Sequence, residues 1–208
     1  MLRESLQLVA KTYDKIAKPY FNATFEKISQ YHLDKFISML PKKSKVLDAG
    51  CGPGRDSQYF KEYGLKVTAI DCSSKMIAEA KKKVKGVTFK KMDMMKMGFK
   101  DKTFDGVWAS ASIIHEDKKD LPNLLKEIRR VLKCNGILYV SAKEGKGSEI
   151  KRDEPYNNEP RQFFCYTVPE LEDLLAQAGF AIVSSEFSED RLGRDTKWID
   201  IYCKKPTS

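Results

Sequence analysis

The sequence predicts an α/β domain in which a doubly wound, mostly parallel sheet of seven strands follows a pair of N-terminal helices. Three observations support this prediction. From Lys45 onward, short apolar runs alternate with helical segments, which is typical of a parallel sheet covered by helices on both faces. The first apolar run ends in a glycine-rich turn, and the last two runs are joined too closely for a helix to lie between them.

The N-terminal segment is expected to be helical. Residues 1–40 carry apolar side chains at helical spacing, which predicts two amphipathic helices. Because proline lacks a backbone N–H, we expect a break near Pro19 and an end at Pro41. Residues 1–41 are therefore predicted to form a helical cap, and residues 42–208 the main domain.

The sheet elements follow in order. Strands are expected at residues 46–49, 66–70, 87–90, 104–109, 136–142, 180–187 and 196–203. One helix is expected after the first strand and ends at about residue 63, and another begins after Ser73-Ser74 and ends at about residue 84. Two more helices are expected at residues 121–132 and 168–178. Residues 143–165 are polar and irregular, which predicts a substrate-side loop or lid. Only eight residues separate Phe187 from Thr196. This connection is too short for a helical crossover, so the seventh strand must be antiparallel to the sixth.

The charge of the chain is concentrated in one segment. The net charge is +9, and residues 81–102 contain nine lysines against two aspartates. This segment covers the third strand, which is expected at a sheet edge, where lysines discourage strand addition. On the presumed substrate side, residues 143–167 have five basic and five acidic side chains. Nucleic-acid binding, which needs a positive contact face, is therefore possible but not favoured.

Composition also limits the other classes of function. The five cysteines include no Cys-x-x-Cys pair, and the two histidines are far from them in sequence, so we expect reduced thiols and no metal site. No apolar run reaches the roughly 18–20 residues of a membrane span, and the N-terminus lacks the apolar stretch of a signal peptide. A cytoplasmic protein without a membrane partner, monomeric or homodimeric, is expected.

The glycine-rich turn and one aspartate predict a nucleoside site. Gly50, Gly52 and Gly54 join the first strand to a helix, where backbone can approach a ligand closely. Arg55 stands where the dinucleotide fingerprint would have its third glycine. Asp71 ends the second strand, where a carboxylate can accept bonds from both ribose hydroxyls. The alternative role for Asp71 is that of a charge at a helix N-terminus.

These segments resemble the motifs of class I S-adenosylmethionine-dependent methyltransferases. Residues 46–54 are similar to the first motif of that family, and Asp71 to its acidic ribose ligand. Residues 91–94, 104–115 and 124–140 resemble the segments that follow, although Cys134-Asn135 replaces the usual Pro-Gly. The resemblance covers about residues 45–203, the final antiparallel hairpin included. It implies a Rossmann-like fold, S-adenosylmethionine as cofactor and S-adenosylhomocysteine as product.

The resemblance also implies roles for individual residues. Asp48 would support the loop, Gly50 and Gly52 would lie beside the amino-acid part of the cofactor, and Asp93 would accept the adenine amino group. The full set of expected cofactor-binding residues is Asp48, Gly50, Cys51, Gly52, Arg55, Asp71, Cys72, Met76, Met92, Asp93, Met94, Ala109 and Ser110. The methionines have an alternative role as irregular core filler.

The expected acceptor site draws on both ends of the chain. The residues expected to bind substrate are Tyr13, Tyr20, Arg161, Phe163, Phe164 and Tyr166. Arg161 and Tyr166 would orient a polar or anionic small molecule, whereas the two phenylalanines would wall the pocket or only dock the loop. Methyl transfer is a direct displacement that depends mainly on alignment. A general base is needed only for an acceptor that is protonated at neutral pH, and His115 is the best-placed candidate.

Three functions remain open. The favoured one is methyl transfer to a small molecule. The alternatives are methyl transfer to tRNA or another nucleic acid, and a non-catalytic regulatory protein that only binds S-adenosylmethionine.

Overall fold

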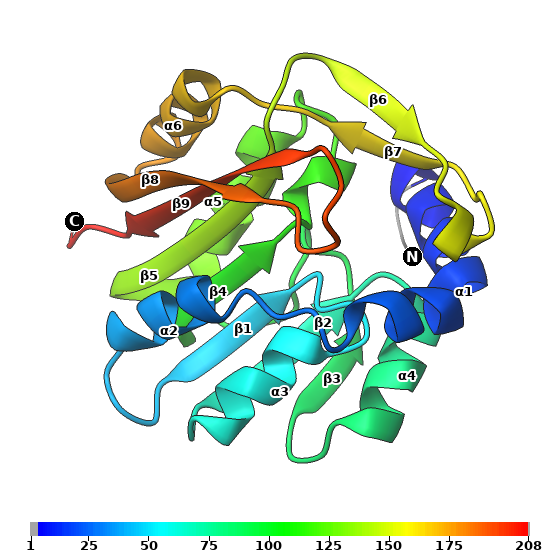
Figure 1. The fold of residues 1–208 in the computed structure, drawn as a ribbon. Coiled ribbons are helices and arrows are strands. Elements are labelled where there is room, and N and C mark those ends of the chain that lie inside the picture. The colour runs from blue at the N-terminus through cyan, green and yellow to red at the C-terminus, as the bar shows by residue number, and fades with distance from the viewer. Residues whose placement is uncertain (1–3, 208) are drawn as a thin grey trace.

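The computed structural model describes residues 4–207, so Met1 to Arg3 of the predicted cap and Ser208 lie outside the described residues. The central sheet has the strand order β3-β2-β1-β4-β5-β9-β8 (Figure 1). Its strands are β1 (Lys45–Ala49), β2 (Lys66–Asp71), β3 (Thr88–Lys91), β4 (Phe104–Ser110), β5 (Leu132–Lys143), β8 (Ala181–Glu189) and β9 (Lys197–Lys204). Only β9 is antiparallel to its neighbours β5 and β8. The predicted seven-stranded sheet with an antiparallel seventh strand is confirmed.

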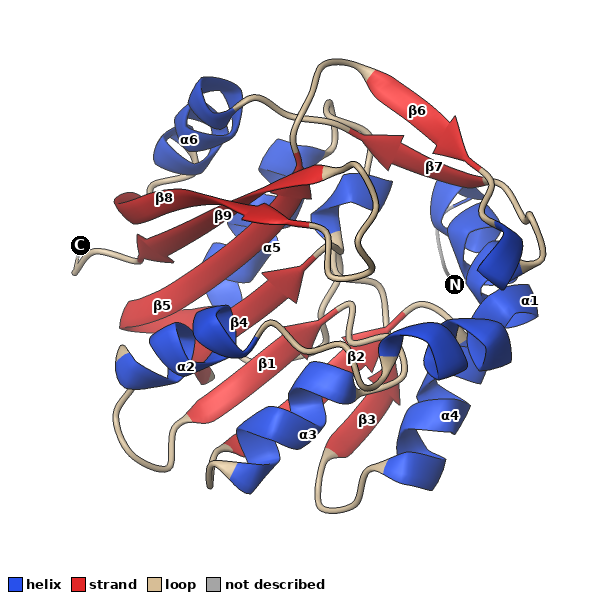
Figure 2. Ribbon diagram, viewed as in Figure 1, coloured by secondary structure: helices blue, strands red, loops and turns tan. Residues whose placement is uncertain are grey.

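Helices cover both faces of the sheet (Figure 2). One face carries α2 (Gln30–Ser38), α3 (Arg55–Glu62) and α4 (Ser74–Lys83), and the other carries α5 (Leu121–Val131) and α6 (Val168–Gln177). Because strand side chains alternate, Val46 of β1 packs with α2 and α3, and Leu47 packs on the opposite side. Burial on both faces explains the nearly continuous apolar runs of the central strands.

The N-terminal helix α1 (Glu4–Thr24) contains Pro19 and continues through it, so the predicted break near that residue is wrong. Proline in a helix interior removes one backbone hydrogen bond. Burial of Ile16 and Ala17 against Met76 and Tyr156 offsets this cost. The helix therefore continues through Pro19 as one element.

The segment predicted as an irregular loop forms a small second sheet. Within residues 143–165, β6 (Ser148–Lys151) and β7 (Arg161–Phe164) pair as antiparallel strands, with the single turn η2 (Glu154–Tyr156) between them. This hairpin stands over the carboxyl ends of the central strands (Figure 2). Its many charged residues hide the alternation of Arg161 and Phe163 on one face, and this is why the sequence pattern did not predict strands here.

The lysine-rich segment lies along one edge of the molecule. β3 is an edge strand of the sheet, and its Lys90 and Lys91 are exposed. Because α4 runs antiparallel to the strands it connects, its final residues Lys81 to Lys83 lie at the amino-terminal side of the sheet. No helix in the described part of the chain is long and apolar enough to cross a membrane.

Candidate functional site

The turn after β1 has a conformation that requires glycine. Gly50, Gly52 and Gly54 have φ angles of +80°, +52° and +86°, in the left-handed region that side chains disfavour. A Cβ atom at Gly50 would also lie 2.4 Å from Cβ of Ser112. Ser112 therefore packs directly on Gly50, whereas the Gly52 backbone, where a Cβ would meet no atom closer than 4.0 Å, leaves a surface that a ligand can approach.

Asp71, at the end of β2, binds this turn directly. Its Oδ2 accepts a hydrogen bond from the Gly52 N–H at 2.9 Å, and its Oδ1 accepts one from the Ser73 N–H at 2.8 Å. Burial raises the pKa of Asp71, while the two N–H donors oppose that rise. Each carboxylate oxygen keeps a second acceptor position. Asp71 thus orders the start of α4 and can still accept two ribose hydroxyls.

A buried acidic pair lies beneath the turn. Ser57 donates to Asp48 at 2.5 Å, and Trp108 Nε1 donates to Asp56 at 2.9 Å. Burial, and then the charge of Asp56, raises the pKa of Asp48 to about 8. Burial by itself raises the pKa of Asp56. The Arg55 guanidinium, whose Nε donates to this carboxylate at 2.7 Å, outweighs burial together with the other donors and lowers the pKa to about 2. Asp48 is therefore mostly neutral at pH 7, whereas Asp56 is ionised.

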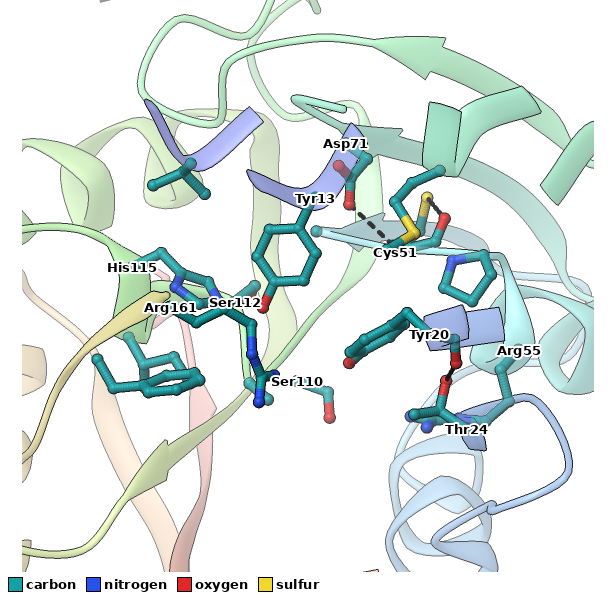
Figure 3. Close-up of a pocket in the computed structure, with 18 of the residues that line it drawn as sticks. Tyr13, Tyr20, Thr24, Cys51, Arg55, Asp71, Ser110, Ser112, His115 and Arg161 are labelled. Atoms are coloured by element: carbon teal, nitrogen blue, oxygen red, sulfur yellow. Dashed lines mark hydrogen bonds between the residues drawn. The ribbon is translucent and has the colours of Figure 1, made fainter. Parts of the chain in front are cut away.

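One pocket joins this turn to the loops above it (Figure 3). Asp48, Gly50, Cys51, Gly52, Arg55, Asp71, Cys72, Met76, Met92, Met94 and Ser110 of the expected cofactor set line it. Of the expected substrate and catalytic set, Tyr13, Tyr20, Arg161, Phe163 and His115 line it. Residues from the two ends of the chain therefore meet above the carboxyl ends of β1, β2 and β4, where ligands bind in open parallel sheets.

Four of the expected residues are not among the described residues that line the pocket, namely Asp93, Ala109, Phe164 and Tyr166. Ala109 and Phe164 neighbour Ser110 and Phe163, and successive strand residues face opposite sides, so both pack on the main core instead. Tyr166 is fully buried in that core. Asp93 accepts a hydrogen bond from the Met95 N–H at 2.8 Å, which closes its own turn.

Helix α1 covers the pocket from the side. Asp14 of α1 binds the start of α4, because its Oδ1 accepts hydrogen bonds from Ser73 Oγ at 2.6 Å and from the Lys75 N–H at 2.9 Å. Tyr13 and Tyr20 project from α1 into the pocket (Figure 3). Their rings meet edge to face at 5.7 Å between centroids.

His115, at the end of the turn η1 (Ile113–His115), is held from two sides. Its Nδ1 lies 3.0 Å from the Gln162 carbonyl, and its Nε2 lies 2.8 Å from the Tyr13 hydroxyl. A carbonyl can only accept, so Nδ1 carries the proton and Nε2 accepts from Tyr13. Burial raises the pKa of Tyr13 far above its usual range, which keeps its proton in place. Burial also lowers the pKa of His115 to about 4, so the imidazole is neutral at pH 7.

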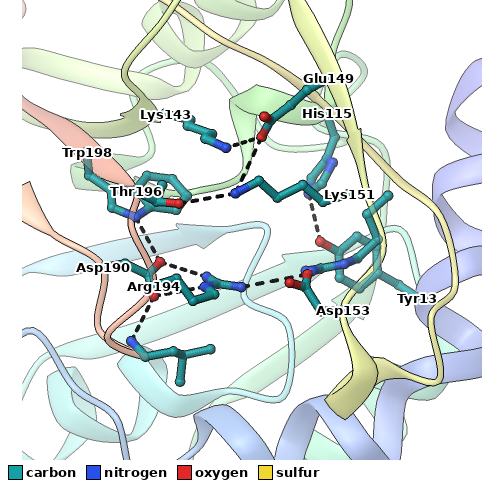
Figure 4. A network of polar contacts seen from close by, with 12 residues as sticks. Tyr13, His115, Lys143, Glu149, Lys151, Asp153, Asp190, Arg194, Thr196 and Trp198 are labelled. Carbon is teal, nitrogen blue, oxygen red and sulfur yellow. Dashed lines mark hydrogen bonds and ion pairs between the residues drawn. The ribbon is translucent and has the colours of Figure 1, made fainter.

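The wall opposite α1 is a network of charges (Figure 4). Arg161 bonds to Asp153. Arg194 bonds to Asp190 at 2.7 and 2.9 Å, and Trp198 donates to the same carboxylate at 3.1 Å. The remaining members of the network are Lys143, Glu149, Lys151 and Thr196. This wall is polar and nearly balanced in charge.

The sequence analysis missed several residues of this pocket. Those with polar side chains are Thr24, Lys27, Asp56, Ser112, Glu116, Lys143, Lys151, Tyr156, Asp190, Arg191, Arg194, Thr196 and Trp198. In the sequence, the charged turn around Gly193 predicts only the direction of the last strand. The two arginines of this turn, Arg191 and Arg194, lie between paired strands at the carboxyl side of the sheet, and this placement indicates a ligand-binding site. No group of three or more His, Cys, Asp or Glu in the described residues could hold a metal ion.

Comparison with known proteins agrees with this geometry. Residues 46–136 match the methyltransferase domain family. A malonyl-[acyl-carrier protein] O-methyltransferase of Enterobacter lignolyticus is 31% identical over 134 residues, which cover 64% of this chain and 52% of that protein. The chain thus spans about half the length of that relative.

Solved structures share this fold. The crystal structure of an S-adenosylmethionine-dependent methyltransferase of Methanosarcina mazei superposes with a TM-score of 0.76 at 25% identity, over 84% of this chain and 98% of that one. The 1,6-didemethyltoxoflavin-N1-methyltransferase of Burkholderia thailandensis, solved with S-adenosylhomocysteine, shares the fold with a TM-score of 0.73 at 21% identity, over 100% of this chain and 92% of that one. The match over residues 46–136 and the shared fold support a class I S-adenosylmethionine-dependent methyltransferase, and the glycine turn, Asp71 and the antiparallel β9 agree with this.

Proposed function

We propose that this protein transfers the methyl group of S-adenosylmethionine to a small-molecule acceptor. The observation that carries the proposal is the single pocket that runs from the glycine turn at Gly50 to His115, with α1 on one side and the β6–β7 hairpin on the other. A concave pocket of this kind suits a small molecule. It also suits the end of a flexible group carried by a larger partner.

The residues of the turn fit the proposed cofactor. Gly50 and Gly52 would lie against its amino-acid part, Asp71 would accept its ribose hydroxyls, and Met92 and Met94 would flank its adenine. The fit rests on the open backbone at Gly52, where a Cβ would meet no atom closer than 4.0 Å, and on the unused acceptor positions of Asp71. When bound, S-adenosylmethionine supplies a methyl group already activated by its sulfonium centre.

The chain's own contribution is mainly alignment. Orientation of two reactants can supply roughly 7–11 kcal/mol of the barrier in favourable cases. Tyr13 and Tyr20 from α1 and Phe163 from β7 enclose the space between the two ends of the pocket. They would exclude water and hold the acceptor against the turn.

His115 can accept a proton where the acceptor carries one. Its Nε2 lone pair points at the Tyr13 hydroxyl, so a proton from the acceptor would reach it either after Tyr13 turns aside or through the Tyr13 oxygen. An acceptor that is already ionised at pH 7, such as a carboxylate, needs no base. The relative from Enterobacter lignolyticus is an O-methyltransferase by name.

Less supports transfer to a nucleic acid. The excess lysines lie on β3 and at the far end of α4, and Lys81 to Lys83 are on the amino-terminal side of the sheet. The pocket opens on the carboxyl-terminal side. A nucleic acid held by Lys81 to Lys83 would not present a base to His115.

Calorimetry and a turnover assay together test the proposal. We expect S-adenosylmethionine and S-adenosylhomocysteine to bind, NAD to bind far more weakly, and S-adenosylhomocysteine to form when a metabolite extract is added. RNA binding is measured in a salt titration, because phosphate contacts give a steep salt dependence. Tighter binding of NAD contradicts the cofactor assignment, and turnover with RNA in place of metabolites favours the second function. Cofactor binding without turnover, with the metabolite extract or with RNA, supports a regulatory protein.

A further inference from the structure

One of the four arginines that line the pocket is bonded differently from the others. Arg55, Arg161 and Arg194 each bond to a carboxylate, on Asp56, Asp153 and Asp190 respectively. Arg191, in the turn between β8 and β9, has no carboxylate within ion-pair distance among the described residues.

The contacts of Arg191 leave half of its guanidinium unused. Nη2 donates to Ser110 Oγ at 3.1 Å, at the end of β4. Nη1 is buried and has no hydrogen-bond partner in the described part of the chain. Leaving a buried donor without a partner costs stability, and the cost is greater when the group is charged. A buried cation of this kind is expected to have a function that compensates for this cost.

The charges around Arg191 leave a positive excess. Burial, followed by the neighbouring Arg55, lowers the pKa of the Arg191 guanidinium, and Asp56 opposes this. Two guanidinium groups therefore share the Asp56 carboxylate, which Arg55 binds directly. One negative charge from a ligand would balance this end of the pocket.

We propose that Arg191 anchors a carboxylate of a bound ligand, an inference that rests on the proposed methyl transfer. A guanidinium fork matches the two oxygens of a carboxylate. The excess of one charge fits a carboxylate better than a phosphate monoester, which carries about −1.5 to −2 at pH 7. Two sources can supply the group. One is the methionine part of S-adenosylmethionine, and the other is an acceptor that is itself an acid.

Two nucleosides distinguish these sources. S-adenosylhomocysteine carries the amino-acid carboxylate, whereas 5′-methylthioadenosine has the same nucleoside without it. Their affinities are measured by calorimetry for the wild type and for Arg191→Gln, which keeps two donors but removes the charge. If Arg191 holds the cofactor, S-adenosylhomocysteine binds about ten- to hundred-fold more weakly to the variant and 5′-methylthioadenosine binds equally well.

A third titration tests the acceptor. Malonate is added to protein saturated with S-adenosylhomocysteine, as a probe for a small carboxylic acid. If Arg191 holds the acceptor, both nucleosides bind the variant as they bind the wild type, and malonate binding to the wild type is lost in Arg191→Gln. Arg191→Lys keeps the charge without the fork, so it should recover only part of the affinity.

Arg152→Gln serves as the matched control, because Arg152 is an exposed arginine of the hairpin that bonds to the Asn158 carbonyl. It should leave all three affinities unchanged. The anchor is overturned if Arg191→Gln changes none of them, or if it weakens both nucleosides equally, which indicates a structural role. Wild-type protein that binds neither nucleoside overturns the proposed function as well.

Discussion

The hydroxyl of Tyr13 lies 2.8 Å from Nε2 of His115, across 102 residues of sequence. The same imidazole donates through Nδ1 to the carbonyl of Gln162. One histidine thus connects the N-terminal helix α1, the turn after β4 and strand β7. These three elements form the cover of the pocket, so we expect the Tyr13–His115 pair to control how firmly that cover is closed.

Replacement of Tyr13 by phenylalanine tests this pair. The change removes the donor and keeps the ring, so Nε2 of His115 is left without its partner. We expect the free energy of unfolding to fall by about 0.5–1.5 kcal/mol. A double-mutant cycle with His115→Gln, measured by urea denaturation, should give a coupling energy of about the same size. Additive effects of the two changes would contradict a bond between them.

The low pKa of His115 predicts how stability depends on pH. Its pKa is about 4 in the folded protein and about 6.5 in an unfolded chain. The neutral imidazole therefore favours the folded state above pH 6.5, and this contribution is lost as the pH falls from 6.5 to 4, up to about 3 kcal/mol. His115→Gln should lose less stability than the wild type over that range, in urea denaturation at pH 7, 5.5 and 4.5. An NMR titration of His115 with a midpoint near 6.5 would contradict this prediction.

The lysine-rich edge of the sheet is predicted to have no role in cofactor binding or turnover. Replacing Lys81, Lys82 and Lys83 together by glutamate should leave S-adenosylhomocysteine affinity and turnover nearly unchanged, because these residues end α4 on the far side of the sheet from the pocket. Lys82 does lose an exposed ion pair with Glu79, which is worth about 0–1 kcal/mol. A large loss of turnover would favour a nucleic acid as the acceptor.

Lys205 is expected to stabilise the fold. Its Nζ donates to the carbonyls of Arg129 and Leu132 at 2.6 and 2.7 Å, at the end of α5 where carbonyls lack helical partners. Lys205→Met should lower the free energy of unfolding by about 1–3 kcal/mol, because two buried acceptors lose a charged donor. The neighbouring Lys204 is exposed and provides the control. Thermal unfolding of both methionine variants makes the comparison, and equal losses would contradict the assigned role.

The elements with a strong local signal were predicted well from sequence. Strands β1, β4 and β5 are buried apolar runs, and the turn at Gly50 needs glycine for its backbone angles, so each has a signal in the local sequence. The structure of α1 at Pro19 does depend on them, because packing against α4 holds the helix together. The same holds for Arg191, whose role depends on Ser110 and Arg55 from other elements. Asp93 follows a strand as Asp71 does, and each closes its own turn, so only the fold shows that Asp71 also binds the Gly52 N–H of the glycine turn.

Asp71 gives the sharpest test of the cofactor site. In Asp71→Ala, charge-assisted bonds to the two ribose hydroxyls are lost, each worth roughly 1.5–3 kcal/mol. Because water can enter the vacated space, we expect a total near the lower end, about 1.5–3 kcal/mol, which is a ten- to hundred-fold weaker affinity for S-adenosylhomocysteine by calorimetry. The variant also loses the bonds to the Gly52 and Ser73 N–H groups, so some loss of stability accompanies it.

Two further variants separate binding from folding. Asp71→Asn keeps the size and one carbonyl acceptor, so it should be more stable than Asp71→Ala and still bind more weakly than the wild type. Asp173→Ala removes a carboxylate from α6, where it accepts a bond from the exposed side chain of Gln177, and it should bind S-adenosylhomocysteine like the wild type. If Asp71→Ala binds as tightly as the wild type, Asp71 only orders the start of α4, and the ribose assignment is wrong. A loss of comparable size in Asp93→Ala would instead restore Asp93 as an adenine ligand, because its turn would then have to open toward the pocket.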